Sequence, residues 1–200
     1  MSITRTRIRA LLALLRPAVV DAHCDTADGP AVRDGRTALA TGNLNHALKW
    51  IPADGEAELR SVFEKALRVR TLGAEAAELA DRLFLETLVR IHRMGEGVGF
   101  TGIAPTGAPI DPVVAAADEA IASGSDEALL AMVPPERRAE LDRRFREAQA
   151  RAGFDVDDVD AGRDYLGAYV RFFTYAEGED HEHDGHAALA HSAHGHAHEH

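Results

Sequence analysis

The most concentrated chemistry in this 200-residue sequence is a run of histidines near its C-terminal end. Eight of the eleven histidines lie within the last twenty residues, interspersed with Ala, Gly, Ser and acidic residues. Neutral imidazole is the commonest protein ligand for metals such as nickel, copper and zinc, so we predict ligands at His181, His183, His186, His194, His196 and His198. Residues 179–200 are expected to form a disordered, metal-gathering tail, and a solubilising tail is the alternative.

A second candidate metal site lies where His23, Cys24 and Asp25 are adjacent. An imidazole, a thiolate and a carboxylate together suit nickel, copper or zinc. Cys24 is the only cysteine, which excludes an internal disulfide framework and any four-thiolate site. In the alternative interpretation Cys24 is a small buried hydrophobe and Asp25 caps a turn.

A short loop rarely completes a metal site alone, so further ligands are expected from Glu86 and His92. Both lie on a helix predicted from about Ala74 to Met94. Their spacing of six corresponds to about 600° of helix rotation, which points the two side chains about 120° apart. Glu86 also has Arg90 at i+4, and the alternative is a surface ion pair between these two.

Composition and charge exclude other classes of partner. The formal net charge of −11 disfavours a nucleic-acid-binding protein, which needs a basic face for phosphates. No segment approaches the about 18 apolar residues of a membrane span, so no membrane partner is expected. Residues 1–22 combine arginines with a short apolar stretch and are expected to be a leader or an N-terminal helix. A cytoplasmic location is favoured, with export if the leader is cleaved near Ala22.

The elements that must position these residues are helices. Apolar residues recur at i, i+3 and i+4 spacing between Pro30 and Gly178, without a convincing alternating strand, so we predict an all-α fold. N-caps are expected at Asp111 and Ser125, and a last helix is expected from about Asp158. The inward face of the predicted 74–94 helix is expected to carry Leu79, Leu83, Leu88 and Ile91.

The helical region contains an internal repeat. Shifting the chain by 82 positions superimposes residues 30–70 on 112–152, and twelve of these 41 pairs are identical. Gly and Pro positions that set helix ends, such as Gly42 and Gly124, coincide. With a shift of 81, residues 80–97 superimpose on 161–178. We predict two repeat units, about 30–97 and 112–178, within one helical domain spanning 23–178.

The repeat separates scaffold from candidate chemistry. Positions shared by both units, such as Phe63 and Phe145, are interpreted as structural. Glu86 and His92 lack a chemically equivalent residue in the second unit, which makes them better functional candidates. The remaining core histidine, His46, is expected to be structural.

Several motifs resemble a bacterial domain-of-unknown-function family. They are the opening His23-Cys24-Asp25-Thr26 with Asp28-Gly29-Pro30, the segment Arg70-Thr71-Leu72-Gly73, and above all Glu86-Thr87-Leu88-Val89-Arg90-Ile91-His92-Arg93. The resemblance covers about residues 22–178 and implies no established activity.

The His-Cys-Asp segment alone is similar to the mature N-terminus of nickel superoxide dismutases, which are also helical bundles. Those enzymes use the terminal amine, a backbone amide, the imidazole and two thiolates. This similarity implies a nickel or copper hook after cleavage before His23, but this sequence lacks the second thiolate.

Three hypotheses follow from the sequence. The first is a helical protein that binds a transition metal, nickel, copper or zinc, through a His-Cys-Asp site and a His-rich tail. The second is a metal-dependent redox enzyme of superoxide-dismutase-like type. The third is a non-catalytic structural or interaction module.

Overall fold

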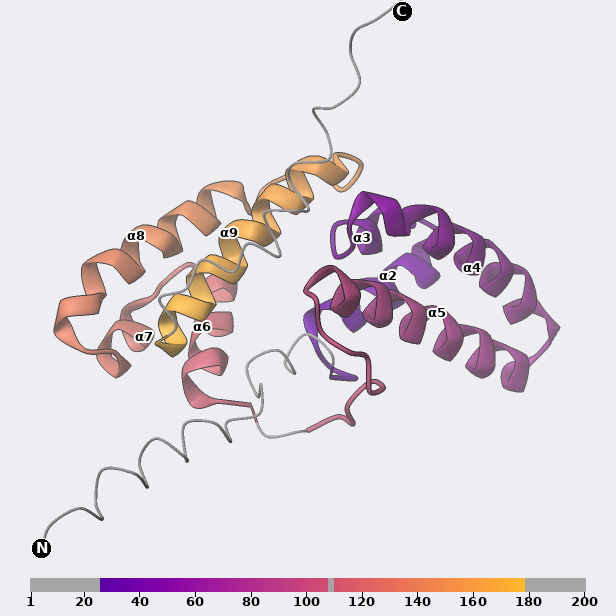
Figure 1. Cartoon of the computed structure of the whole chain (residues 1–200), viewed down its shortest axis with the longest axis horizontal. Coiled ribbons are helices and arrows are strands. Elements are labelled where there is room, and N and C mark those ends of the chain that lie inside the picture. Colours follow the sequence, from indigo (N-terminus) through magenta and orange to yellow (C-terminus); the bar gives the residue numbers. More distant parts are fainter. Residues whose placement is uncertain (1–25, 108–109, 179–200) are drawn as a thin grey trace, which may run out of the picture.

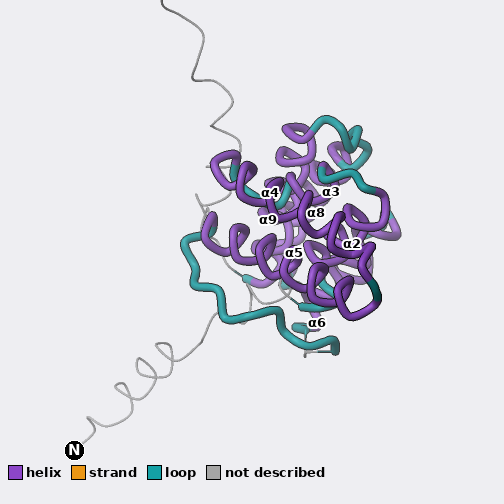
Figure 2. Tube along the Cα trace, turned by 90° about the vertical axis from the view of Figure 1, so that its right-hand side faces the viewer, coloured by secondary structure: helices purple, strands orange, loops and turns teal. Residues whose placement is uncertain are grey.

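Eight α-helices and two short 3-10 helices make up most of residues 26–107 and 110–178, which are the parts of the chain that the computed structural model describes. In chain order they are α2 (Pro30–Thr41), α3 (Asn45–Leu48), η3 (Ala53–Gly55), α4 (Glu56–Val69), η4 (Arg70–Leu72), α5 (Ala74–Gly95), α6 (Pro112–Ser123), α7 (Glu127–Met132), α8 (Pro135–Arg151) and α9 (Val159–Glu177). Figure 2 shows no strand in these ranges, which confirms the predicted all-α class. His23, Cys24, Asp25 and the predicted tail lie outside them.

The helices form two groups that follow each other along the chain (Figure 1). In the first group α4 packs on α5, and α2 packs on α5 and α3. In the second group α8 packs on α9, and α6 contacts α7, α8 and α9. No helix in the described ranges is long and apolar enough to cross a membrane.

Helix ends in the two groups follow the offset of 82 read from the sequence. α2 runs from Pro30 to Thr41 and α6 from Pro112 to Ser123, so both ends differ by 82 positions. The next residues, Gly42 and Gly124, have φ angles of 73° and 77°, a left-handed conformation that favours glycine. Equivalent helices therefore end in the same way.

The predicted N-cap at Asp111 is confirmed, and the last helix begins near Asp158, as predicted. The Asp111 side chain accepts a hydrogen bond from the Val113 N–H at 2.7 Å, and the Asp158 side chain accepts one from the Ala161 N–H at 2.9 Å. The prediction for Ser125 is wrong. Its N–H donates to the Ser123 hydroxyl, which keeps Ser125 in the preceding turn, and α7 begins two residues later.

The predicted inward face of α5 is half right. Leu88 and Ile91 are buried, but Leu79 and Leu83 are 68% and 57% exposed. The buried row instead passes through Ala80 and Phe84. Because each residue turns a helix by about 100°, Leu79 and Leu83 are rotated away from that row by one position.

The two groups share a continuous core and are joined by polar contacts at their junction. Arg163 of α9 is only 6% exposed, and its guanidinium pairs with Glu56 and donates to the Ile51 carbonyl at 3.3 Å. Asp157, before α9, accepts hydrogen bonds from the Asn43 and Asn45 amides at 3.0 Å each. The first group is therefore fixed against α9 by a buried charge and an exposed amide–carboxylate cluster.

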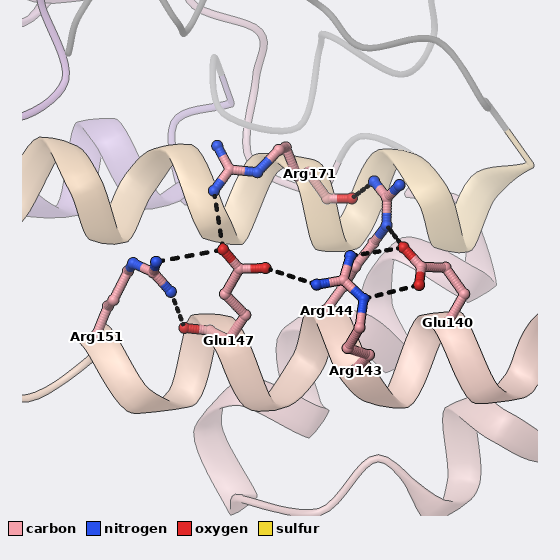
Figure 3. A network of polar contacts seen from close by, with 6 residues as sticks. All are labelled: Glu140, Arg143, Arg144, Glu147, Arg151 and Arg171. Carbon is pink, nitrogen blue, oxygen red and sulfur yellow. Dashed lines mark hydrogen bonds and ion pairs between the residues drawn. The ribbon is translucent and has the colours of Figure 1, made fainter.

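The charged face of α8 carries an ion-pair network (Figure 3). Arg143 donates two hydrogen bonds to Glu140, at 2.7 and 2.8 Å, and Arg144 donates a third at 2.8 Å. Arg144 also donates to the carbonyl of Arg171 on α9 at 3.1 Å. The network therefore ties α8 to α9 on the outer side of this helix pair.

Candidate functional site

His92 lies in the last turns of α5 and is 2% exposed. Its Nδ1 lies 2.8 Å from the backbone carbonyl oxygen of Trp50. A carbonyl oxygen only accepts hydrogen bonds, so Nδ1 must carry a proton and donate it. The hydrogen-bond network thus assigns a proton to Nδ1, so in the neutral ring the lone pair lies on Nε2.

The Nε2 atom of His92 faces a carboxylate. Glu96, four residues further along, places Oε1 3.4 Å from it. The other oxygen of Glu96 lies 3.4 Å from the Arg93 guanidinium, which is itself buried. Sequence reasoning missed Glu96, although its i+4 spacing from His92 was the available signal. At the end of α5 the structure therefore brings together an imidazole nitrogen, a carboxylate and one guanidinium.

Trp50 holds the His92 ring from a second side. The two rings meet edge to face, with centroids 5.7 Å apart and an interplanar angle of 86°. The indole Nε1 in turn donates to Asp34 Oδ2 at 2.7 Å, and the same oxygen lies 2.9 Å from Lys49 Nζ. Because Trp50 is fixed by Asp34, the carbonyl and ring that orient His92 are fixed as well.

The structure does not bring Glu86 to His92. The two residues are six positions apart, about 9 Å along the helix axis. Glu86 forms an ion pair with Arg82 at 2.8 Å, not with Arg90 as the sequence suggested. This contact raises the pKa of Arg82 through a hydrogen bond and the charge of Glu86. Arg90 instead pairs with Glu58 of α4 at 2.5 Å.

The His92–Glu96 pair is not by itself a complete metal site. Within residues 26–107 and 110–178, no group of three or more His, Cys, Asp and Glu side chains is arranged to hold a metal ion. The pair offers two ligand atoms, and any others must come from elsewhere in the chain. The predicted ligands His23, Cys24, Asp25 and the six tail histidines lie outside the described ranges.

The loop after α5 links the end of that helix to the first described residues. The Val98 N–H donates to the Arg93 carbonyl at 2.9 Å. Further along this loop, Ala104 forms an isolated parallel bridge with Thr26, and its carbonyl accepts the Ala27 N–H at 2.8 Å. Thr26 is buried, and it directly follows the His-Cys-Asp segment in the sequence.

Fold and site together define an all-α protein in which a buried histidine faces a partly exposed carboxylate at the end of α5, the longest helix of the described residues. Comparison with known families places residues 28–175 in a family of unknown function, DUF6448, and the chain belongs to that family. The predicted relation to a domain-of-unknown-function family is confirmed in this form. The match begins at Asp28, so it does not include the His-Cys-Asp-Thr opening. No curated protein and no solved structure shows significant similarity to the chain.

Proposed function

We propose that this protein binds a transition-metal ion, nickel, copper or zinc, at a site built on His92, and that its His-rich tail gathers the same metals. The observation that carries the proposal is the orientation of His92. Its Nδ1–H is engaged by the Trp50 carbonyl, while Nε2 faces the Glu96 carboxylate at 3.4 Å.

This orientation is typical of a metal-binding histidine. Such residues usually donate one ring N–H to a carbonyl or carboxylate, which fixes the tautomer and raises the basicity of the coordinating nitrogen. The Trp50 carbonyl supplies that contact. The lone pair of a neutral Nε2 and the carboxylate repel each other. A cation bound to both atoms turns this repulsion into attraction. The pair therefore suits a divalent ion.

We propose that the remaining ligands are His23, Cys24 and Asp25. A thiolate and an imidazole favour nickel, copper and zinc over magnesium and calcium, which prefer oxygen ligands. The Thr26–Ala104 bridge supports this assignment, since it fixes the residue after this segment to the loop that leaves α5. Glu86 is left out because it is engaged by Arg82.

The tail supplies metal to this site in the proposal. Histidines at alternating positions bind metal ions without a preformed cage, and mild acid releases the metal by protonating them. Metal storage or delivery is the function that both features support. A superoxide-dismutase-like reaction is not part of the proposal, because the sequence holds one cysteine and such a site uses two thiolates.

Counting bound metal separates the two parts of the proposal. In a full-length tail variant the six named tail histidines are changed to Ser, and binding of nickel, copper and zinc is measured by equilibrium dialysis. We expect this variant to retain one tightly held metal ion per chain. Adding His92→Gln or Glu96→Gln should weaken that binding by tenfold or more, as expected for loss of a ligand or its orienting partner.

The matched control is His46→Gln in the same tail variant, because His46 lies on α3 in the same group of helices. It should bind metal as the tail variant does. A tail variant that binds no metal contradicts the core site and leaves the tail as a metal binder. Full-length protein that binds no metal contradicts the whole proposal and favours a structural or interaction module.

A further inference from the structure

A separate pocket lies at the junction of the two groups of helices. Its volume is about 460 Å³, and its walls come from α2, the turn after α3, α6 and α9. Its charged and aromatic lining residues include Asp34, Lys49, Trp50, Asp118, Tyr165 and Tyr169. We call it the junction pocket. Ligand pockets of small molecules span roughly 300–1,000 Å³, so it is large enough for one.

Two carboxylates are held in place in this pocket, one from each group of helices. Asp34 of α2 accepts the Trp50 indole N–H at 2.7 Å. Asp118 of α6 accepts the hydroxyl of Tyr169 on α9. Asp34 also pairs with the Lys49 ammonium at 2.9 Å. Because each carboxylate is already held in place by such contacts, neither has to reorganise when a ligand enters, which lowers the cost of binding.

Aromatic rings line the space beside the carboxylates. Trp50 and Tyr169 are 3% and 6% exposed, and Tyr165 lies 6.3 Å from Tyr169, between ring centroids. Burial, and then the charges of Asp34 and Asp118, raises the pKa of Tyr165. This phenol therefore stays neutral at physiological pH, and both carboxylates act on it.

The position of Lys49 shows which chemical group the walls of this pocket attract. Its ammonium lies 2.9 Å from Asp34, 5.2 Å from the centroid of Phe154 and 6.0 Å from that of Trp50. Carboxylates and aromatic faces both attract cations, and amines or quaternary ammonium ions are commonly bound in this way. The same combination of an acid and aromatic rings recurs on the opposite side of the junction, where it consists of Asp118, Tyr165 and Tyr169.

We propose that the junction pocket binds a small organic ammonium ion, with its charge near Asp118 and its alkyl groups against Trp50 and Tyr165. Arg33 also borders the pocket, but its side chain is exposed, whereas the acids and rings are partly or fully buried. The buried groups dominate recognition because electrostatic interactions are stronger where water is excluded. The proposal is independent of the metal site.

Trp50 is the only tryptophan, so in the metal-free protein its fluorescence can report on ligand binding in this pocket. Metal-free full-length protein is titrated at constant ionic strength with tetramethylammonium, propylammonium and sodium propionate. We expect a saturable fluorescence change with one or both ammonium ions and none with propionate. Asp118→Asn, which keeps an acceptor for Tyr169, should weaken ammonium binding at least fivefold.

Arg33→Gln is the matched control, since it removes a charge of opposite sign from the same pocket. It should leave ammonium binding unchanged or strengthen it. Tyr165→Phe, which keeps the ring, should also retain most of the binding. The proposal is overturned if neither ammonium ion gives a saturable change, or if Asp118→Asn binds it as tightly as the parent. Propionate binding that is lost in Arg33→Gln would identify an anion site instead.

Discussion

The carbonyl oxygen of Trp50 accepts the Nδ1–H of His92 at 2.8 Å, across 42 positions of sequence. This contact decides which nitrogen of the neutral His92 ring carries the proton, and it places the only tryptophan beside the candidate metal ligand. The same residue donates its indole N–H to Asp34, on the wall of the junction pocket. Trp50 therefore connects the two candidate sites through its backbone on one side and its side chain on the other.

The contact between His92 and Trp50 also predicts a stability effect that does not depend on metal. His92→Ala removes a buried ring and leaves the Trp50 carbonyl without its donor. Loss of a buried hydrogen-bond partner costs about 1–3 kcal/mol, and the cavity adds to it. Urea unfolding of the metal-free protein measures this loss. His46→Ala should change stability less, and an equal loss in both variants would count against a special role for His92.

Arg163 is predicted to hold the two groups of helices together. It is 6% exposed and pairs with Glu56. Arg163→Met removes this ion pair and leaves the Ile51 carbonyl without its donor, and loss of a buried hydrogen-bond partner costs about 1–3 kcal/mol. Arg82, its equivalent at an offset of 81, is 73% exposed in its side chain. Arg82→Met should therefore stay within about 0.5 kcal/mol of the parent in chemical denaturation. Similar losses in the two variants would refute this assignment.

The α8 network predicts a pH dependence. Hydrogen bonds from Arg143 and then Arg144 lower the pKa of Glu140 from 4.5 to about 2. A depressed pKa in the folded state stabilises the protein above the unfolded pKa. That contribution decreases as pH falls from 4.5 and is lost near 2. Since the pair is exposed, Glu140→Gln should cost only about 0.2–1 kcal/mol at pH 7.

Unfolding free energies of the parent and Glu140→Gln, measured between pH 7 and 2, check this dependence. The difference should shrink toward zero at the acid end, and added salt should reduce it at pH 7. A difference that grows as pH falls would contradict the assigned sign.

The two left-handed helix ends predict matched effects in the two groups. Gly42→Ala and Gly124→Ala place a Cβ at φ angles of 73° and 77°, although no atom lies within 4 Å of it. The cost is therefore conformational, about 1–2 kcal/mol in each variant. Gly99→Ala is the control, because it also has open space and does not have a positive φ angle. The loss of stability is measured by thermal unfolding. If Gly99→Ala loses as much stability as Gly42→Ala and Gly124→Ala, backbone strain is not the cause.

Local signals predicted much of the fold. The cap at Asp111, the start of the last helix near Asp158 and the helix ends after Thr41 and Ser123 depend on neighbouring residues, and these are visible in the sequence. The inward face of α5 was predicted wrongly because Leu79 and Leu83 are apolar, but within residues 26–107 and 110–178 no element covers them. Apolar character alone does not say which row of a helix a neighbouring helix covers.

The candidate site was only partly predictable, because local sequence patterns do not show which side chains meet in space. His92 was selected because the second repeat lacks an equivalent, and it proved to be buried and oriented. Glu86 was selected in place of Glu96. Arg82 and Arg90 both lie four residues from Glu86, so spacing alone did not show which of them it pairs with. The junction pocket depends on α2, α6 and α9 meeting in space, and no short-range pattern encodes that meeting.

The most direct test of the metal proposal is a copper titration of the full-length tail variant, followed by Trp50 fluorescence. Copper(II) quenches a nearby indole, and the His92 ring lies 5.7 Å from that of Trp50. We predict quenching that is complete at one copper per chain and is abolished by His92→Gln but retained in His46→Gln. Copper that leaves Trp50 fluorescence unchanged, or quenches it equally in His92→Gln, would contradict a metal site at His92.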